Sequence, residues 1–503
     1  MSQSRRKFLL TSAAAASAVL TGCAQWPSGS TKEIANGKVN GASRRLIVDT
    51  RSIEVNGRAA TVYGLHQPGG TRGLFLDPGE RFAVELDNRL NEPTIVHWHG
   101  QTPPSDQDGV SQFGVPELQP GERRAYDFAA RPGTYWMHSH HGFQHQKLLA
   151  APLVVRTADD VKADRQEVTI FLEDFLFRDP AEVFSELQKG KADSMGAMTG
   201  QKSGEQPRSM GGMSGMSGMG SMNRSRMPDQ MPGMKMDLND VDFDAYLAND
   251  RTLNDPEVIR VEQGGRVRLR IINGASSTNF HIDLGALQGT VATVDGNAVR
   301  PLTGRRFGLA MAQRIDILVD VPNGTGAWPI LAVREGARQQ TGIILASNGA
   351  NVGKIAGMAT ATTGPVSFDQ ELRLSALRPL VDRPVDSHAV LMLTGSMQPY
   401  TWGINHKGWD NRDTVKIRKG QRVAITFQNT TMMAHPMHLH GHHFQIVALN
   451  GKAFSGALRD TVHVPPMAKL TLAFDADNAG RWLMHCHNLY HMMAGMITEV
   501  GYV

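Results

Sequence analysis

One β-strand pattern occurs three times along this 503-residue chain. The copies are G-E-R-F-A-V-E-L-D-N at 79–88, G-G-R-V-R-L-R-I-I-N at 264–273 and G-Q-R-V-A-I-T-F-Q-N at 420–429. In each copy Gly is followed by Arg two residues later and by Asn nine residues later, with alternating apolar residues between them. This alternation is typical of a half-buried strand that begins after a turn. The repetition predicts three copies of one β-rich module.

Each copy continues into two further elements that resemble one another. The first continuation reads P-T-I-V-H-W-H-G (93–100), S-T-N-F-H-I-D-L-G (277–285) and A-H-P-M-H-L-H-G (434–441). The second reads G-T-Y-W-M-H-S-H (133–140), G-A-W-P-I-L-A-V (326–333) and G-R-W-L-M-H-C-H (480–487). In the middle copy Leu331 and Val333 stand where the outer copies have histidines, so we predict histidine pairs in the outer modules only.

The length, at about 150 residues per domain, agrees with three modules. Gly and Pro are frequent (52 and 25) and helical periodicity is scarce, which predicts an all-β protein of small Greek-key sandwiches or barrels. We place the domains at 45–160, 165–355 and 365–503, with an insertion at 189–240 inside the second. Eleven methionines occur there between Met195 and Met236, among Gly and Ser and without aromatic residues, so the insertion cannot form a core of its own.

The N-terminus has the features of an export signal. Residues 4–10 read S-R-R-K-F-L-L and precede a short apolar stretch, so we predict a signal at 1–22 that resembles the twin-arginine type. The run L-T-G-C at 20–23 resembles a lipobox and would make Cys23 a lipidated membrane tether; the alternative is an ordinary signal peptide with an incidental cysteine. Either interpretation predicts a periplasmic protein, exported in the folded state if the twin-arginine route applies.

Charge and cysteine content exclude several classes of protein. The formal net charge is +4, and three of these charges belong to the signal (Arg5, Arg6 and Lys7), so a nucleic-acid-binding surface is not supported. Only Cys23 and Cys486 occur, which excludes a disulfide scaffold and a zinc site made of four cysteines.

Four histidine clusters point to a metal. They are H-W-H-G (97–100), H-S-H-H-G (138–142), H-P-M-H-L-H-G-H (435–442) and H-C-H-N-L-Y-H-M-M-A-G-M (485–496). Histidines two apart on a strand face the same side, so each H-x-H can direct two imidazoles to one metal cluster. Two histidines, a cysteine and a methionine are the ligands of a blue-copper site, and here they can be His435, Cys486, His491 and Met496. Because Cys486 lies between His485 and His487, its copper would lie on the opposite side of the strand from theirs.

With these motifs the chain resembles the three-domain multicopper oxidases of the bacterial laccase and cuprous oxidase kind, over essentially its whole mature length. The resemblance implies cupredoxin domains and four copper ions, which couple four one-electron oxidations to the reduction of O2 to water. It also implies a trinuclear centre between the first and third domains, and no type 1 copper in the first domain, where Ser139 replaces the cysteine. By this resemblance the ligands are His435, Cys486, His491 and Met496 for type 1 copper, His97 and His438 for type 2 copper, and His99, His138, His140, His440, His485 and His487 for the type 3 pair.

Two carboxylates match acidic residues of this family. Asp108 matches the carboxylate beside the trinuclear centre that delivers protons, and the alternative is a turn residue before Gly109. Asp460 matches a residue that hydrogen-bonds a type 1 histidine, and the alternative is a solvated residue at the start of a strand. The family often has Glu where this chain has Met492, so half of the proton route lacks its usual residue. We expect no ligand role for His141, His145, His281, His442 or His443, and a packing role for Trp98 and Trp136.

The methionine-rich insertion favours Cu(I) as the reductant. Thioether sulfur prefers Cu(I), and a flexible M-x-x-M chain can surround one ion with several sulfurs. A linker of biased composition remains the alternative. We therefore expect a monomeric cuprous oxidase that protects the cell envelope from copper; the other hypotheses are a laccase acting on phenols, a periplasmic copper-binding buffer, and, less favoured, a copper-free scaffold. The methionines expected to bind Cu(I) are Met210, Met213, Met216, Met219 and Met222.

Overall fold

The computed structural model describes residues 44–190 and 238–503. The predicted signal, Cys23 and the methionines from Met195 to Met236 lie outside the described residues.

Six β-sheets, two from each third of the chain, make up the described structure, and the prediction of an all-β fold is confirmed. The first third forms the sheets β2-β1-β4-β6 and β3-β8-β7-β5. Its elements are β1 (Arg44–Val55), β2 (Arg58–His66), β3 (Leu74–Leu76), β4 (Phe82–Asn88), β5 (Val96–His99), η1 (Ser105–Gln107), β6 (Arg123–Phe128), β7 (Gly133–Ser139), β8 (Ala150–Val155) and α1 (Ala158–Lys162).

The second third forms the sheets β10-β9-β12-β17-β14-β15 and β11-β19-β18-β13-β16. Its elements are β9 (Gln166–Phe175), α2 (Pro180–Gln188), β10 (Ala245–Ala248), β11 (Val258–Arg260), β12 (Arg266–Asn273), β13 (Phe280–Asp283), β14 (Gly289–Val294), β15 (Asn297–Gly304), β16 (Arg306–Leu309), β17 (Arg314–Asp320), β18 (Ala327–Arg334) and β19 (Gln340–Ala346).

The last third forms one sheet around β21-β20-β23-β29-β25-β26 and another in the order β22-β31-β30-β24-β28. Its elements are α3 (Asp369–Arg373), β20 (Ser387–Met397), β21 (Tyr400–Ile404), β22 (Val415–Ile417), β23 (Arg422–Asn429), β24 (His435–Leu439), β25 (Phe444–Leu449), β26 (Lys452–Ala453), β27 (Leu458–Arg459), β28 (Thr461–Val464), β29 (Lys469–Asp475), β30 (Arg481–Cys486), α4 (Leu489–Met493) and β31 (Ile497–Tyr502).

The threefold repeat of the sequence is a threefold repeat of structure. Its conserved spacing produces strands β4, β12 and β23, and the glycines that precede them all have positive φ. The asparagine that ends each strand fixes the loop that follows it. Its side-chain oxygen accepts a hydrogen bond from the backbone N–H two residues later, and its side-chain NH2 group donates hydrogen bonds to loop carbonyls. These asparagines are Asn88, Asn273 and Asn429.

The two histidine-bearing strands of each outer domain lie side by side. In the first domain β5 pairs with β7 and sets His97 opposite His138, while in the third β24 pairs with β30 and sets His438 opposite His485. The middle domain pairs β13 with β18 in the same way, but there His281 faces Val333. The register therefore gathers four imidazoles on one face in each outer domain.

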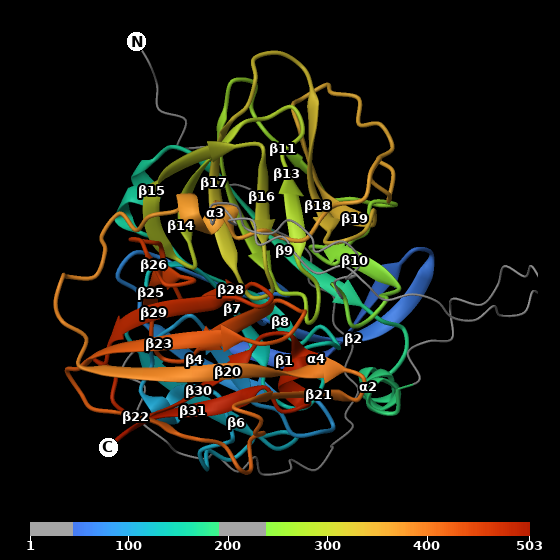
Figure 1. Cartoon of the computed structure of the whole chain (residues 1–503). Helices are drawn as coiled ribbons and strands as arrows, with labels where there is room; N and C mark the ends of the chain where they lie inside the picture. Colours follow the sequence, from blue (N-terminus) through green and yellow to red (C-terminus); the bar gives the residue numbers. More distant parts are fainter. Residues whose placement is uncertain (1–43, 191–237) are drawn as a thin grey trace, which may run out of the picture.

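In Figure 1 the second domain (green to yellow) forms the upper part, and the first (blue) and third (orange to red) share the lower part. Helix α2 leaves the second domain and lies beside β21 of the third. Its Val183 and Leu187 belong to the same buried apolar cluster as Cys486. Within the described part of the chain, no helix has the length and apolar character needed to cross a membrane.

Candidate metal centre

Eight buried histidines meet between the first and third domains. Four of them lie on β5 and β7 or directly after β7, and the other four lie on β24 and β30 or directly after these two strands. Within each of three groups the ligand atoms lie within 4.8 Å of one another. The groups are His97 and His438 with His99; His99, His138 and His487; and His140, His440 and His485.

The first group contains the two predicted type 2 ligands in matching orientations. His97 donates from Nδ1 to the carbonyl of Asp108 at 2.8 Å, and His438 donates from Nδ1 to the carbonyl of Asp460 at 2.9 Å. Each ring therefore keeps its lone pair on Nε2, and the two Nε2 atoms lie 3.5 Å apart. Two lone pairs that converge on one point are suited to a metal ion.

The other two groups contain buried nitrogens without partners. His99 Nδ1, His138 Nε2 and both ring nitrogens of His140 and His487 have no hydrogen bond. Burial lowers the pKa of each of these four imidazoles well below its usual value, so the rings are neutral near pH 7. Neutral imidazole is the ligand form that copper binds. Unpaired buried nitrogens are costly, and bound metal would satisfy them. The residues therefore fit a copper cluster.

A second site lies on the opposite face of β30. Cys486 Sγ is 3.7 Å from the Nδ1 atoms of both His435 and His491, and these two nitrogens are 3.1 Å apart. Met496 is fully buried, and its backbone is bonded to both Cys486 and His491. This set of soft sulfur and imidazole ligands suits a blue-copper site.

Comparison with known proteins identifies the family. Three models described as multicopper oxidase match residues 52–160, 166–350 and 382–502. The chain is 32% identical to the multicopper oxidase MmcO of Mycobacterium tuberculosis, over 84% of this chain and 80% of that protein. The chain is a multicopper oxidase.

The chain is also similar to other copper proteins in sequence and in structure. Copper resistance protein A of Escherichia coli is 26% identical over 86% of this chain and 88% of that one. The structure of Fet3p, a multicopper oxidase that functions in iron import, has a TM-score of 0.72 at 16% identity, and covers 92% of this chain and 90% of its own. The laccase of Botrytis aclada has a TM-score of 0.68 at 20% identity, covering 92% and 87%. The chain is thus an oxidoreductase that uses copper ions.

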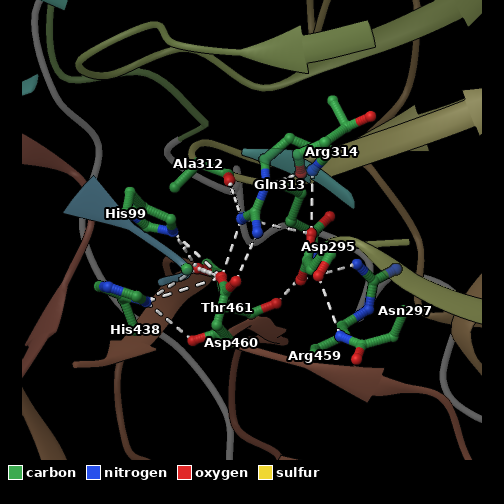
Figure 2. A network of polar contacts seen from close by, with 12 residues as sticks. His99, Asp295, Asn297, Ala312, Gln313, Arg314, His438, Arg459, Asp460 and Thr461 are labelled. Atoms are coloured by element: carbon green, nitrogen blue, oxygen red, sulfur yellow. Dashed lines mark hydrogen bonds and ion pairs between the residues drawn. The ribbon is translucent and has the colours of Figure 1, made fainter. Parts of the chain in front are cut away.

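The predicted partner of Asp460 in this multicopper oxidase is wrong. Asp460 Oδ1 accepts from Nε2 of His99 at 3.0 Å, and Figure 2 shows the carboxylate beside His99 and His438, two of the predicted trinuclear ligands. The cause is strand register. The pairing of β24 with β28 sets His438 opposite Thr461, beside Asp460, whereas His435 lies three residues further along, opposite Val464. Burial raises the pKa of Asp460, but the adjacent Arg314 outweighs burial and lowers it.

The carboxylate that contacts a predicted type 1 ligand is Asp240 instead. Its Oδ1 accepts from His491 Nε2 at 3.1 Å and from the Tyr400 hydroxyl at 3.1 Å, and its side chain is inaccessible to solvent. Burial raises the pKa of Asp240, but the contact with His491 outweighs burial, so the net shift is downward. Sequence analysis missed this residue because it assigned position 240 to the insertion.

Asp108 both forms a turn with Gly109 and directs its carboxylate to a predicted copper ligand. Gly109 has a φ of +79°, and a Cβ there would lie 1.8 Å from the carbonyl oxygen of Val96, so the Asp-Gly pair does form a tight turn against β5. The carboxylate nevertheless contacts a predicted copper ligand, since Oδ2 accepts from Nδ1 of His440 at 2.7 Å, and buried Oδ1 has no hydrogen bond. Delivery of protons by Asp108 stays a prediction.

The histidines without a predicted ligand role surround the centre or lie away from it. His145 and His443 donate to the carbonyls of Gly274 and Gly100, and His442 contacts the Tyr502 hydroxyl. His141 pairs with Glu117, and His281 donates to the carbonyl of Gly364. The Ser139 hydroxyl donates a hydrogen bond to Gln144. The side chains of Trp98 and Trp136 are buried. Met492 packs against a small apolar cluster.

Proposed function

We propose that this multicopper oxidase holds four coppers, one of type 1, one of type 2 and a type 3 pair, and that its reductant is Cu(I). Four Cu(I) ions would each lose one electron, and O2 would take up four electrons and four protons to give two water molecules. The type 1 copper, when bound, accepts single electrons, and the trinuclear coppers supply the chemistry of O2 reduction. Eleven of the twelve predicted ligands group into one Cys-containing site and three histidine sets, and Met496 is buried and bonded through its backbone to Cys486 and His491, which supports this proposal.

One observation favours Cu(I) over a phenol. A cavity of about 30 Å³ beside the predicted type 1 site has Met311, Met433 and His463 among its lining residues. The Nδ1 atom of His463 has no hydrogen bond, and burial lowers the pKa of this histidine to about 4, so it is neutral near pH 7. Thioether and imidazole are ligands that suit Cu(I). The volume equals about one water molecule, whereas a benzene ring needs about 150 Å³.

The position of this cavity suits electron transfer. Its lining includes Ala434, which precedes His435, and Asn488, whose side chain caps the helix that carries His491. Leu238, where the described chain resumes after residue 190, also lines it. We therefore propose that methionines of the insertion, Met210, Met213, Met216, Met219 and Met222, capture Cu(I) for this site.

Substituting the two cavity methionines tests the reductant. Met311→Leu with Met433→Leu keeps the apolar volume and removes both sulfurs, so the KM for Cu(I) should rise while oxidation of a small phenol stays unchanged. Met137→Leu, a buried methionine of the first domain, is the matched control. An unchanged KM for Cu(I) in the double variant, with faster turnover of the phenol than of Cu(I), would favour the laccase alternative. Absence of O2 consumption with either reductant would favour a copper-binding buffer.

We further propose that the protein is monomeric and exported to the periplasm by the twin-arginine route, with Cys23 as a lipid anchor. The paired Arg5 and Arg6 and the L-T-G-C run support this proposal. Replacement of both arginines by lysine should leave the protein in the cytoplasm, and Cys23→Ser should release the exported protein from the membrane fraction.

A further inference from the structure

The second domain supplies none of the twelve predicted copper ligands, yet one of its side chains reaches the trinuclear centre. Arg314, the first residue of β17, is fully buried, and its guanidinium makes a two-pronged contact with the Asp460 carboxylate. Arg314 Nη1 donates to Asp460 Oδ1 at 2.8 Å, and Nη2 donates to Oδ2. Figure 2 shows this pair between the histidines of the outer domains and the acidic and basic side chains of the second domain and β27.

Asp460 in turn fixes two ligands of different domains. Its Oδ1 receives the Nε2 proton of His99, which leaves Nδ1 of that ring as the lone pair for metal. Its backbone carbonyl receives the Nδ1 proton of His438, which leaves Nε2 of that ring for metal. One residue therefore sets the orientation of a type 3 ligand from the first domain and a type 2 ligand from the third.

We propose that Arg314 is a positioning residue of the trinuclear centre and acts through Asp460. A guanidinium offers two parallel donors to a carboxylate, so it fixes both the place and the rotation of that group. A fixed carboxylate holds the His99 ring with Nδ1 toward the metal, and hydrogen-bond partners of this kind commonly govern metal affinity. The proposal rests on the assignment of His99 and His438 as copper ligands and does not depend on the reductant.

The surroundings keep Arg314 in one orientation. Its remaining N–H groups donate to the carbonyls of Thr134 at 3.2 Å and Ala312 at 2.8 Å, so the first and second domains both hold it. Asp295 lies 3.5 Å from the guanidinium and also binds Arg459. The interior therefore contains an alternating chain of charges, Glu371, Arg459, Asp295, Arg314 and Asp460, that ends at His99.

The H-W-H-G motif makes room for this pair. Gly100 follows His99 with a φ of +84°, and a Cβ there would lie 2.6 Å from Asp460 Oδ2 and 2.7 Å from Arg314 Nη2. A side chain at position 100 would occupy the space that the carboxylate and the guanidinium share. The glycine of this motif thus serves the same pair that orients the preceding histidine.

Substitutions at both positions, with a matched control, test the proposal. Arg314→Gln removes the charge, Arg314→Lys keeps the charge without the paired donors, and Asp460→Asn removes the other partner. Arg270→Gln is the control, because Arg270 is also a buried second-domain arginine and its partners, three acidic residues and the Thr134 hydroxyl of the first domain, are not predicted copper ligands. Each variant is characterised by copper content, the type 2 electron paramagnetic resonance signal, the type 1 absorption, and the rate of reoxidation by O2 after chemical reduction.

We expect Arg314→Gln to lower trinuclear copper occupancy or the reoxidation rate by about 10–100-fold and to alter the type 2 signal, while the type 1 absorption persists. Arg314→Lys should be less impaired than Arg314→Gln. Asp460→Asn should reproduce the defect, and the double variant Arg314→Gln with Asp460→Asn should be no worse than the more impaired single variant, since the two act as a unit.

Two results would overturn the proposal. One is an Arg314→Gln or Arg314→Lys protein that loses thermal stability as Arg270→Gln does but keeps full copper content and an unchanged type 2 signal, which would make Arg314 a structural contact only. The other is additive loss in the double variant, which would show that Arg314 does not act through Asp460. Because the protein is reduced chemically, neither result depends on whether Cu(I) is the reductant.

Discussion

Among the single residues, Cys486 has the most direct connection to both predicted copper sites. On β30 its side chain faces His435 and His491, while the residues on either side of it, His485 and His487, face the histidines of the predicted trinuclear centre. Burial raises the pKa of the Cys486 thiol, so metal is needed to hold it as the thiolate. The peptide links on both sides of Cys486 form the shortest covalent path between the sites.

Cys486→Ser should therefore abolish the blue absorption and the oxidase activity without unfolding the protein. Serine is close in size but is not a soft thiolate ligand, so the type 1 copper loses its charge-transfer band and its function in accepting electrons. Absorption spectroscopy and metal analysis should find the trinuclear coppers retained, because their histidines are unchanged. A variant that stays blue and active would refute the type 1 assignment.

Asp108→Asn should slow O2 reduction by about 10²-fold while reduction of the type 1 copper keeps its rate. The amide keeps the size and part of the hydrogen bonding to His440 but cannot carry a proton. Rapid mixing of the reduced enzyme with O2 measures the step. Asp106→Asn, two residues away and exposed, is the control and should behave like the unmodified protein. Equal rates in both variants would leave Asp108 as a turn residue.

The sequence revealed ligands more readily than their supporting residues. The H-x-H and H-C-H motifs have a local signature, because strand alternation alone decides which side chains share a face. Asp460, Asp240 and Arg314 act across domain boundaries, where strand register and domain packing decide the partner. For this reason the sequence predicted the wrong histidine partner for Asp460 and did not predict the contacts of Asp240 and Arg314.

Among the elements, the repeated strands were predictable and helix α2 was not. Strands β4, β12 and β23 follow from a period of two and a fixed Gly-to-Asn spacing. Helix α2 spans only nine residues, begins at Pro180 after an Asp179 cap, and directly precedes the insertion. It buries Val183 and Leu187 against the third domain, so the chain enters and leaves the insertion beside the type 1 site although the insertion interrupts the second domain.

Deletion of residues 195–236 should leave both copper centres intact and raise the KM for Cu(I). If the thioethers contribute about 1.4 kcal/mol to capture, the rise is about tenfold. A second variant keeps the length of the segment and replaces its eleven methionines by serine. It distinguishes an effect of the thioether groups from an effect of the segment itself. Phenol oxidation should be unchanged or faster in both variants. Unchanged kinetics with both substrates would identify the segment as a linker.

At the scale of the whole molecule, the predicted trinuclear centre joins domains that are far apart in sequence. His99 and Asp460 are separated by 361 positions, and His97 and His438 by 341. This interface consists of closely packed imidazoles, four of which have ring nitrogens without a hydrogen bond. Copper that binds only the folded state should therefore raise the free energy of unfolding.

The copper-free protein should lose stability as the pH falls below about 6.5. Burial lowers the pKa of His485 and His463 to about 4 in the folded protein, whereas the unfolded chain takes up these protons near pH 6.5. Stability is thus complete above about pH 6.5 and declines toward pH 4, by about 1.4 kcal/mol per pH unit for each histidine. Urea unfolding at about pH 7.5 and about pH 5.5 measures the effect. Identical midpoints would show that these rings are protonated in the fold.

The long separation between paired ligands also has a consequence for the order of synthesis. While the ribosome is still making the second domain, the nascent chain has four of the eight trinuclear histidines and no type 1 ligand. His485, Cys486 and His487 complete both type 3 groups and begin the electron path within three consecutive residues. On these assignments a partly made chain has no path by which electrons could reach O2. We therefore expect redox activity to begin only when the last domain has docked onto the first.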